Sequence, residues 1–192
     1  MRKPNYFWSL GILAIALFSF SFNPSSPNPP VKPTNDLNEA IQWMSWEEAQ
    51  EAMAKEPKKI VVDIYTDWCG WCKRMDAATF QQNYIAEYIN ENYYAVKFNA
   101  EQKEDIEFQG KKFKFVDNGR RGYHELAANI MNGRLGYPTI AFLDEEMNVI
   151  QAIPGYKGPE EFEQIMTYFA GDHHKKVSWD KYQANYTPLP KE

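Results

Sequence analysis

The sequence contains two cysteines, and they stand three residues apart in the segment D-W-C-G-W-C-K at positions 67–73. Residues spaced i and i+3 share one face of a helix, so the sulfurs of Cys69 and Cys72 can meet. Free N–H groups and the positive end of the helix dipole stabilise a thiolate at the start of a helix. We therefore predict that Cys69 attacks disulfides and that Cys72 acts as the resolving thiol.

This cysteine pair has two alternative interpretations besides redox chemistry. C-x-x-C is also half of a zinc site, but there is no second C-x-x-C, and His173 and His174 are adjacent, without the usual gap of about three to five residues. A buried pair of unreactive thiols is the other alternative. The pair falls between a predicted strand and a predicted helix, which favours redox chemistry with no metal and no cofactor.

Composition narrows the class of protein. A chain of 192 residues with 44% hydrophobic residues can bury one core of ordinary size, and we expect a monomer. The 21 Lys and Arg residues face 26 Asp and Glu residues, and no basic run is long enough to follow a phosphate backbone, so we expect no nucleic-acid partner. Two neighbouring cysteines allow no framework of structural disulfides, so the core must supply the stability.

The first residues predict export from the cytoplasm. Arg2 and Lys3 precede an uncharged apolar stretch at residues 6–22, and Ser19-Phe20-Ser21 offers a small-x-small cleavage pattern. We predict a signal peptide at residues 1–22 that is cleaved after Ser21. The alternative is an uncleaved membrane anchor, because the stretch is at the lower limit of about 17–25 residues that span a bilayer. Both place the protein in the periplasm or another extracytoplasmic space, the second with a membrane tether.

Three further segments follow the predicted signal. Residues 23–36 are rich in Pro, Ser and Asn, which indicates an extended linker. Residues 37–172 carry the alternating apolar patterns of a folded domain. Residues 173–192 form a tail with no clear period.

The first half of the domain predicts a βαβ unit. Ser45 and Glu48 have the spacing of a capping box, which predicts a helix that ends near Pro57. A β-branched run at residues 60–65 predicts a buried strand. The segments that follow predict a helix at 72–81, a helix at 83–91 and a strand at 93–98.

The second half predicts a hairpin, a helix, two strands and a closing helix. The segment 101–121 is polar, and residues 106–108 and 112–116 alternate around Gln109-Gly110-Lys111, which is a hairpin signal. The remaining segments are a helix at 123–131, strands at 139–143 and 149–153 joined by residues 144–148, and a helix from Pro159 to residue 170.

Four motifs in this order resemble those of the thioredoxin family, in its exported branch with a W-C-x-x-C-K centre. They are Val62-Asp63, W-C-G-W-C-K at 68–73, V-K-F-N at 96–99 and G-Y-P-T at 136–139. The resemblance covers about residues 46–170. It implies an α/β thioredoxin fold, with a central mixed β-sheet flanked by helices. The predicted β-hairpin is an insertion into this fold, before the helix that leads to a cis-proline.

The resemblance also implies a proton-transfer group. Asp63 stands at the family's buried-acid position, which implies a carboxyl group beneath the cysteines that exchanges a proton with Cys72. Lys97 is its implied charge partner, and burial would raise the pKa of the acid. In the alternative, Asp63 lies at the strand edge and meets Lys97 at the surface.

A substrate-binding rim is implied around the cysteines. Tyr137-Pro138 resembles the family's cis-proline, whose loop faces the cysteines and lets an extended substrate pair with the preceding residue. The alternative for this loop is an ordinary turn. Gly155 resembles the family glycine that leaves space beside the site. The expected substrate-binding residues are Trp68, Gly70, Trp71, Tyr137 and Gly155.

Two departures from the family pattern bear on function. Trp71 stands where the best-known cytoplasmic reductases have proline, which leaves the reduction potential open. The segment 101–121 lengthens the chain before the predicted helix at 123–131. We expect it near the rim, either to select a partner or to serve as a surface hairpin that only packs.

These features predict an extracytoplasmic thiol–disulfide oxidoreductase. We expect it to work as a reductase that takes electrons from a membrane donor and passes them to protein disulfides. The alternatives are a disulfide oxidase or isomerase, or a non-catalytic binding or chaperone module on the same fold. The single domain without a dimerisation segment argues against an isomerase.

Overall fold

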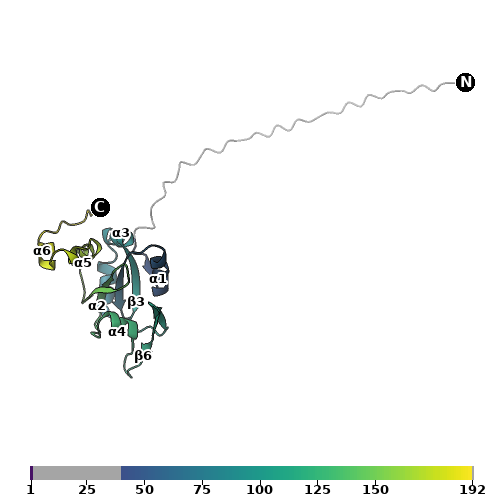
Figure 1. The fold of residues 1–192 in the computed structure, drawn as a ribbon, viewed down its shortest axis with the longest axis horizontal. Helices are drawn as coiled ribbons and strands as arrows, with labels where there is room; N and C mark the ends of the chain where they lie inside the picture. Colours follow the sequence, from purple (N-terminus) through teal and green to yellow (C-terminus); the bar gives the residue numbers. More distant parts are fainter. Residues whose placement is uncertain (2–39, 192) are drawn as a thin grey trace. The chain divides into compact units, whose positions relative to one another are not determined.

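Figure 1 shows the fold in a computed structural model, which describes Met1 and residues 40–191. Its centre is a five-stranded sheet in the order β1-β3-β2-β8-β9. The strands are β1 (Trp43–Met44), β2 (Lys59–Tyr65), β3 (Tyr93–Asn99), β8 (Thr139–Leu143) and β9 (Val149–Pro154). The first three pair in parallel, and β8 and β9 are antiparallel to their neighbours, so the predicted mixed sheet is confirmed.

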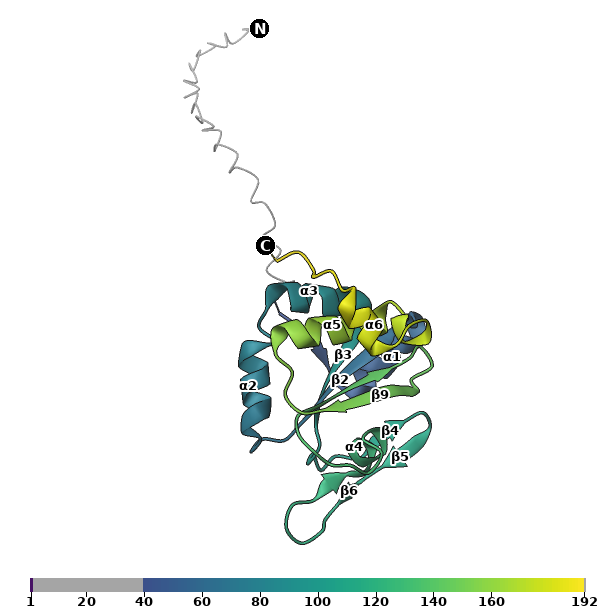
Figure 2. The same ribbon diagram turned by 90° about the vertical axis from the view of Figure 1, so that its left-hand side faces the viewer.

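Helices cover both faces of this sheet (Figure 2). On one face lie α1 (Trp46–Lys55) and α4 (Glu125–Ile130), and on the other α2 (Gly70–Ala78), α3 (Asn83–Asn92) and α5 (Pro159–Ala170). Each face has its own aromatic core. Trp46 meets Phe98 edge to face at 5.7 Å on the first, and Phe142 stacks on Phe169 at 4.5 Å on the second.

Local sequence signals account for these elements. The side chain of Ser45 accepts the Glu48 N–H at 3.2 Å and Glu48 accepts the Ser45 N–H at 2.8 Å, so the predicted capping box begins α1. Strand β2 lies in the middle of the sheet, where side chains on both faces are buried, and its β-branched run supplies side chains that tolerate this burial. Helix α2 begins earlier than predicted, at Gly70, because Cys69 itself caps it.

The insertion contains the predicted hairpin, β4 (Ile106–Phe108) and β5 (Lys111–Phe113), turned by Gln109 and Gly110 at φ 50° and 71°. The prediction of a single strand over residues 112–116 was wrong, because β5 ends at Phe113. The Lys114 N–H donates to Glu125 Oε2 and the Lys114 carbonyl accepts the Glu125 N–H, both at 2.8 Å, which bends the chain. Strand β6 (Phe115–Val116) pairs instead with β7 (Tyr123–His124), so α4 begins two residues later than predicted.

The tail packs against α5, although its sequence has no period. It contains a 3-10 turn, His173–Lys175, and helix α6 (Trp179–Ala184). Tyr182 Oη donates to Thr167 Oγ1 at 2.9 Å, and Tyr186 Oη donates to Oε1 of Glu163 at 2.7 Å. Glu163 is buried, and the rings of Trp179 and Tyr182 lie 5.3 and 5.0 Å from that of Tyr168, so polar anchors and aromatic packing together hold this segment.

The N-terminal predictions fall largely outside this description. Apart from Met1, the predicted signal peptide or anchor at residues 1–22 and the linker at 23–36 lie outside the described residues. Within the described part of the chain, every helix is too short or too polar to cross a membrane.

One buried histidine joins the insertion to α4. The Nδ1 atom of His124 accepts the Leu126 N–H at 3.2 Å, and its Nε2 lies 3.1 Å from the Glu104 carbonyl. We predict that His124→Ala lowers the free energy of unfolding by about 2–4 kcal/mol, because it leaves two polar groups unpaired beside a cavity. Urea unfolding measures this change.

The matched control is His124→Asn, which keeps a side chain able to cap α4. We expect Asn to lose less stability than Ala. Equal losses would show that the capping bond contributes nothing.

Candidate active site

The two cysteines form a disulfide at the N-terminus of α2. Their Cα atoms are 5.3 Å apart, and their exposed fractions are 5% for Cys69 and 3% for Cys72. The Cys69 N–H donates to the Thr66 carbonyl at 3.1 Å, which ties the cap to the chain leaving β2. The Cys72 N–H donates to Cys69 Sγ at 3.0 Å.

This geometry favours a thiolate at Cys69 in the reduced protein. A backbone N–H already points at its sulfur, and the first turn of α2 contains no acidic residue. The positive end of the helix dipole therefore stays uncompensated within that turn and stabilises negative charge on the sulfur.

Asp63 is buried and paired, so the alternative of a surface acid was wrong. Its exposed fraction is 2%, and its register on β2 places it beside Lys97 of β3. Lys97 Nζ lies 2.6 Å from Asp63 Oδ2. Asp63 Oδ1 has no hydrogen-bond partner among the described residues, which leaves it free to exchange a proton.

A third charged residue completes this cluster and was not predicted. Lys97 Nζ also pairs with Oδ1 of Asp76 on α2. The sequence did contain a signal, because Asp76 follows Cys72 by four residues and therefore shares its side of the helix. The rings of Trp43, Tyr65 and Phe80 surround the ammonium group at 4.9, 5.1 and 5.2 Å.

The surroundings shift both buried charges. Burial raises the pKa of Asp63 from 3.8 to about 6, with Lys97 opposing the rise and Asp76 adding to it. Burial by itself would lower the pKa of Lys97, but the two carboxylates outweigh it and raise that pKa overall. The buried Asp63 carboxyl group therefore titrates near pH 6.

The loop before β8 has the predicted conformation. The Tyr137–Pro138 peptide is cis, and the Pro138 carbonyl accepts the Gly155 N–H at 2.8 Å. Apart from Gly155 and its two chain neighbours, no atom of the described residues lies within 4 Å of the place where a Cβ of Gly155 would stand. Its φ of 87° shows that backbone conformation, rather than space, requires glycine there.

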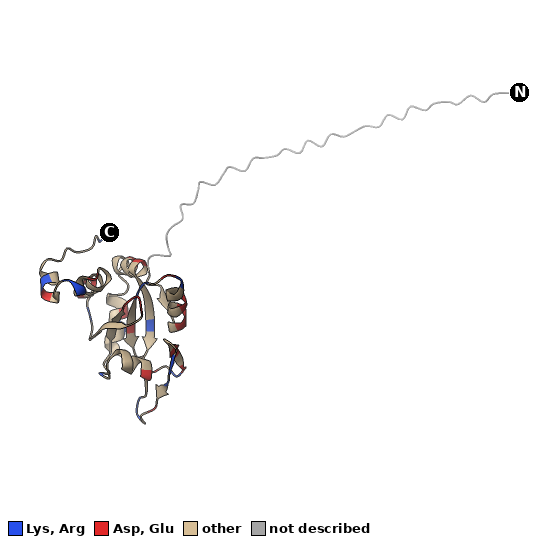
Figure 3. Ribbon diagram, in the orientation of Figure 1, with Lys and Arg blue, Asp and Glu red and all other residues tan. Residues whose placement is uncertain are grey.

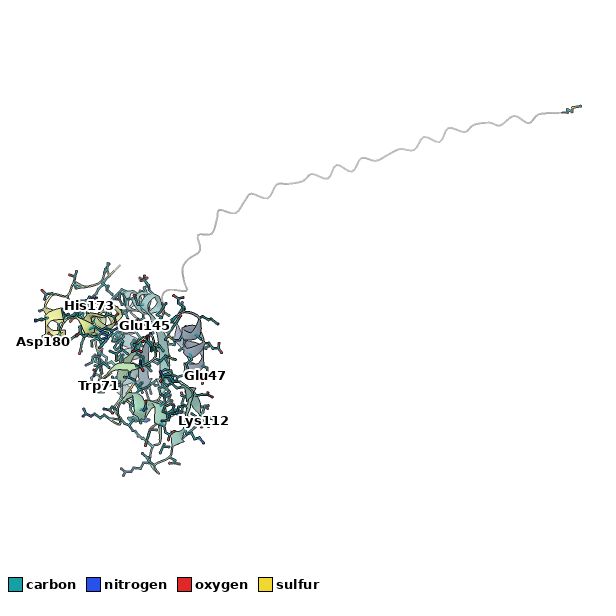
Figure 4. All side chains as sticks on the ribbon, in the orientation of Figure 1. Glu47, Trp71, Lys112, Glu145, His173 and Asp180 are labelled. Carbon is teal, nitrogen blue, oxygen red and sulfur yellow. A yellow bond between two sulfur atoms is a disulfide. The ribbon has the colours of Figure 1, made fainter. Side chains whose placement is uncertain are left out.

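Two tryptophans flank the disulfide, and their exposed fractions are 49% for Trp68 and 59% for Trp71. Figure 4 labels Trp71 among the side chains of the domain. The ring centroids of Trp71 and Tyr156 are 5.5 Å apart, and the Arg74 guanidinium lies 5.8 Å from the centroid of the Trp71 ring. The other tryptophan, Trp68, lies edge to face with Tyr137, and their ring centroids are 6.0 Å apart.

The insertion reaches Trp68 from both of its ends. Trp68 Nε1 donates to both carboxylate oxygens of Glu101 at 3.0 Å, and the Arg121 guanidinium lies 4.0 Å from the indole ring. The expected position near the rim is therefore confirmed. Sequence patterns did not single out Glu101, Arg121, Arg74 or Tyr156, because nothing local marks which loop residues converge in space.

The charged residues are distributed unevenly. Figure 3 shows a mostly uncharged sheet, with charged positions concentrated on the helices and in the insertion. Among the described residues, no group of three or more His, Cys, Asp and Glu side chains is placed to hold a metal ion.

A disulfide at a helix N-terminus, together with a buried acid on the preceding strand and a cis-proline loop, defines a thiol–disulfide oxidoreductase of the thioredoxin class. The profile of the thioredoxin-like domain matches residues 46–170. The chain therefore belongs to the thioredoxin-like family.

Solved structures share this fold. A thioredoxin-fold protein from Helicobacter pylori matches with 16% identity and a TM-score of 0.55, over 78% of this chain and 91% of that chain. A thioredoxin from Thermus thermophilus matches with 14% identity and a TM-score of 0.50, over 72% and 98%. The oxidoreductase DsbH matches with 18% identity and a TM-score of 0.49, over 75% and 94%. The comparison with curated proteins finds no match.

The raised pKa of Asp63 predicts a pH-dependent stability. Between about pH 4 and pH 6 the folded state keeps the Asp63 proton, whereas the unfolded chain has released it. The free energy of unfolding therefore falls by up to about 3 kcal/mol as the pH rises from 4 to 6 and above. We predict that Asp63→Asn is more stable than the wild type at pH 8 by about this amount and equally stable near pH 4. Urea unfolding of the oxidised protein between pH 4 and pH 8 measures the difference.

The matched control is Asp180→Asn, which removes an exposed carboxylate on α6. It should leave the pH dependence unchanged. A difference between Asp63→Asn and wild type that stays constant with pH would contradict the burial of an ionisable Asp63.

Proposed function

We propose that this protein is an extracytoplasmic protein-disulfide reductase, fed with electrons by a membrane dithiol donor. The observation that carries the proposal is the Cys69–Cys72 disulfide at the capped N-terminus of α2, on the α2 face of the sheet that also buries Asp63. The signal pattern at residues 1–22 supports an extracytoplasmic location.

The reaction proceeds in two exchanges. The Cys69 thiolate attacks one sulfur of a target disulfide, forming a mixed disulfide and releasing the other target sulfur as a thiolate. Cys72 then gives its proton to the Asp63 carboxylate, and its thiolate attacks Cys69 Sγ. The second target sulfur leaves, so two electrons pass to the target and the pair becomes the disulfide. The released thiolates take protons from Asp63 and from solvent.

The rim supplies the binding surface. Trp68, Trp71 and Tyr137 present aromatic rings around the disulfide, and an extended substrate can pair with the backbone of Tyr137 beside the cis-proline. Gly70 and Gly155 add no side chain to this surface, and a Cβ at either position would meet open space beyond its neighbours along the chain among the described residues. We assign these residues to substrate binding and Lys97 to holding Asp63.

A disulfide oxidase or isomerase is the second candidate, because Trp71 stands where the best-known cytoplasmic reductases have proline and leaves the reduction potential open. The residues between the cysteines are a main control of reduction potential in this family, and the same fold operates from about −270 to −120 mV. A third candidate is a binding or chaperone module that uses the rim without the cysteines.

The reduction potential decides between the first two. We predict a potential of the Cys69–Cys72 pair near or below about −230 mV, measured at equilibrium against glutathione. A value between about −180 and −120 mV would instead assign an oxidase or isomerase.

The roles of the two cysteines are tested by trapping. We predict that Cys72→Ser accumulates a mixed disulfide with a substrate protein, because nothing resolves it, whereas Cys69→Ser accumulates none. Non-reducing electrophoresis with mass spectrometry measures both. The double variant serves as control, and retained biological activity in it would support the binding module.

A further inference from the structure

In this site one ammonium group forms ion pairs with two carboxylates. Lys97 Nζ lies 2.6 Å from Asp63 Oδ2 and also pairs with Asp76 Oδ1. The ammonium has three N–H donors, so it can hold both partners at once. The rings of Trp43, Tyr65 and Phe80 lie within 5.2 Å of the same ammonium group.

The two carboxylates differ in their access to water. The side chain of Asp76 is 41% exposed, whereas that of Asp63 is 2% exposed. With both ionised, the cluster carries one uncompensated negative charge, which costs least on the solvated acid. The proton that neutralises the excess charge therefore goes to Asp63.

We propose that Asp76 is a positioning residue for the dithiol reaction: by sharing Lys97, it weakens the stabilisation of the ionised Asp63 carboxylate, so that Asp63 binds its proton more tightly and releases it only at higher pH. This inference rests on the proposed role of Asp63 as the proton acceptor for Cys72. Asp76 stands one helical turn after Cys72, so α2 carries both the reacting thiol and the group that adjusts its proton acceptor.

The charged and titratable groups around Asp63 come from several elements. Lys97 faces it from β3, Asp76 and the Cys72 position come from α2, and Tyr65 lies on its own strand. On β8, its register partner Ile140 carries no charge. Asp76 is therefore the acid whose removal changes the charge beside Asp63 while leaving Asp63, Lys97 and the cysteines in place.

The test is Asp76→Asn in the full-length reduced protein, with a small peptide disulfide as substrate. Removal of a neighbouring negative charge leaves Lys97 to Asp63 alone, which favours the ionised Asp63 that accepts the Cys72 proton. We expect the acid inflection of the rate to move down by about one pH unit, making the variant about fivefold faster at pH 5 and within about twofold of wild type at pH 8. Single-turnover rates with acid quench and thiol alkylation measure the ratio.

Controls separate this mechanism from a direct effect on the cysteines. Asp180→Asn should follow the wild type at every pH. In an Asp63→Asn background, the Asp76→Asn change should no longer alter the pH dependence, because its effect passes through Asp63. The same acceleration in that background, or none in either, would overturn the proposal.

A readout without turnover keeps the inference separate from the proposed function. Carbon-13 NMR of the Asp63 carboxyl in the oxidised protein, assigned by comparison with Asp63→Asn, should show the same shift of the midpoint in Asp76→Asn. If no disulfide peptide is reduced but the midpoint moves, the proposed reductase fails and the coupling between the acids holds. An unmoved midpoint overturns the coupling itself.

Discussion

The buried ion pair between Asp63 and Lys97 joins the elements that carry the chemistry. A carboxylate almost fully removed from water must have a partner, and the parallel register of β2 and β3 places Lys97 directly beside it. Lys97 in turn holds Asp76, which attaches α2, and with it the cysteines, to the centre of the sheet. The charge surrounding Asp63 therefore depends on how this one ammonium group is shared.

A second constraint is the turn from β2 into α2. The Thr66 carbonyl accepts the Cys69 N–H, and Cys69 then caps the helix through its sulfur. A sulfur in a capping position meets the same N–H groups and helix dipole that would stabilise a hydroxyl or carboxylate oxygen there. The capping interaction that begins α2 also favours the thiolate, so helix formation and reactivity have one physical origin.

The insertion connects the rim to the far side of the molecule. Its two ends meet at Trp68, and its middle packs on α1 and α4 through the apolar core of that face. Buried His124 joins the insertion to the start of α4. The insertion therefore contributes to two parts of the protein at once, the aromatic surface beside the cysteines and the core beneath it.

Much of this protein could be predicted from local sequence. The spacing of Cys69 and Cys72, the capping box and the apolar run of β2 are short-range signals, because helix and strand periodicity determine which neighbouring residues share a face. The contacts of Asp76 and Glu101 were not predictable in this way. They join residues 21 and 33 positions apart, and only the packing of α2 on β3 and the course of the insertion bring those atoms together. Sequence by itself determined the reactive pair and its fold, whereas the tertiary structure decided which charges surround that pair, because burial and pairing are properties of the packed chain.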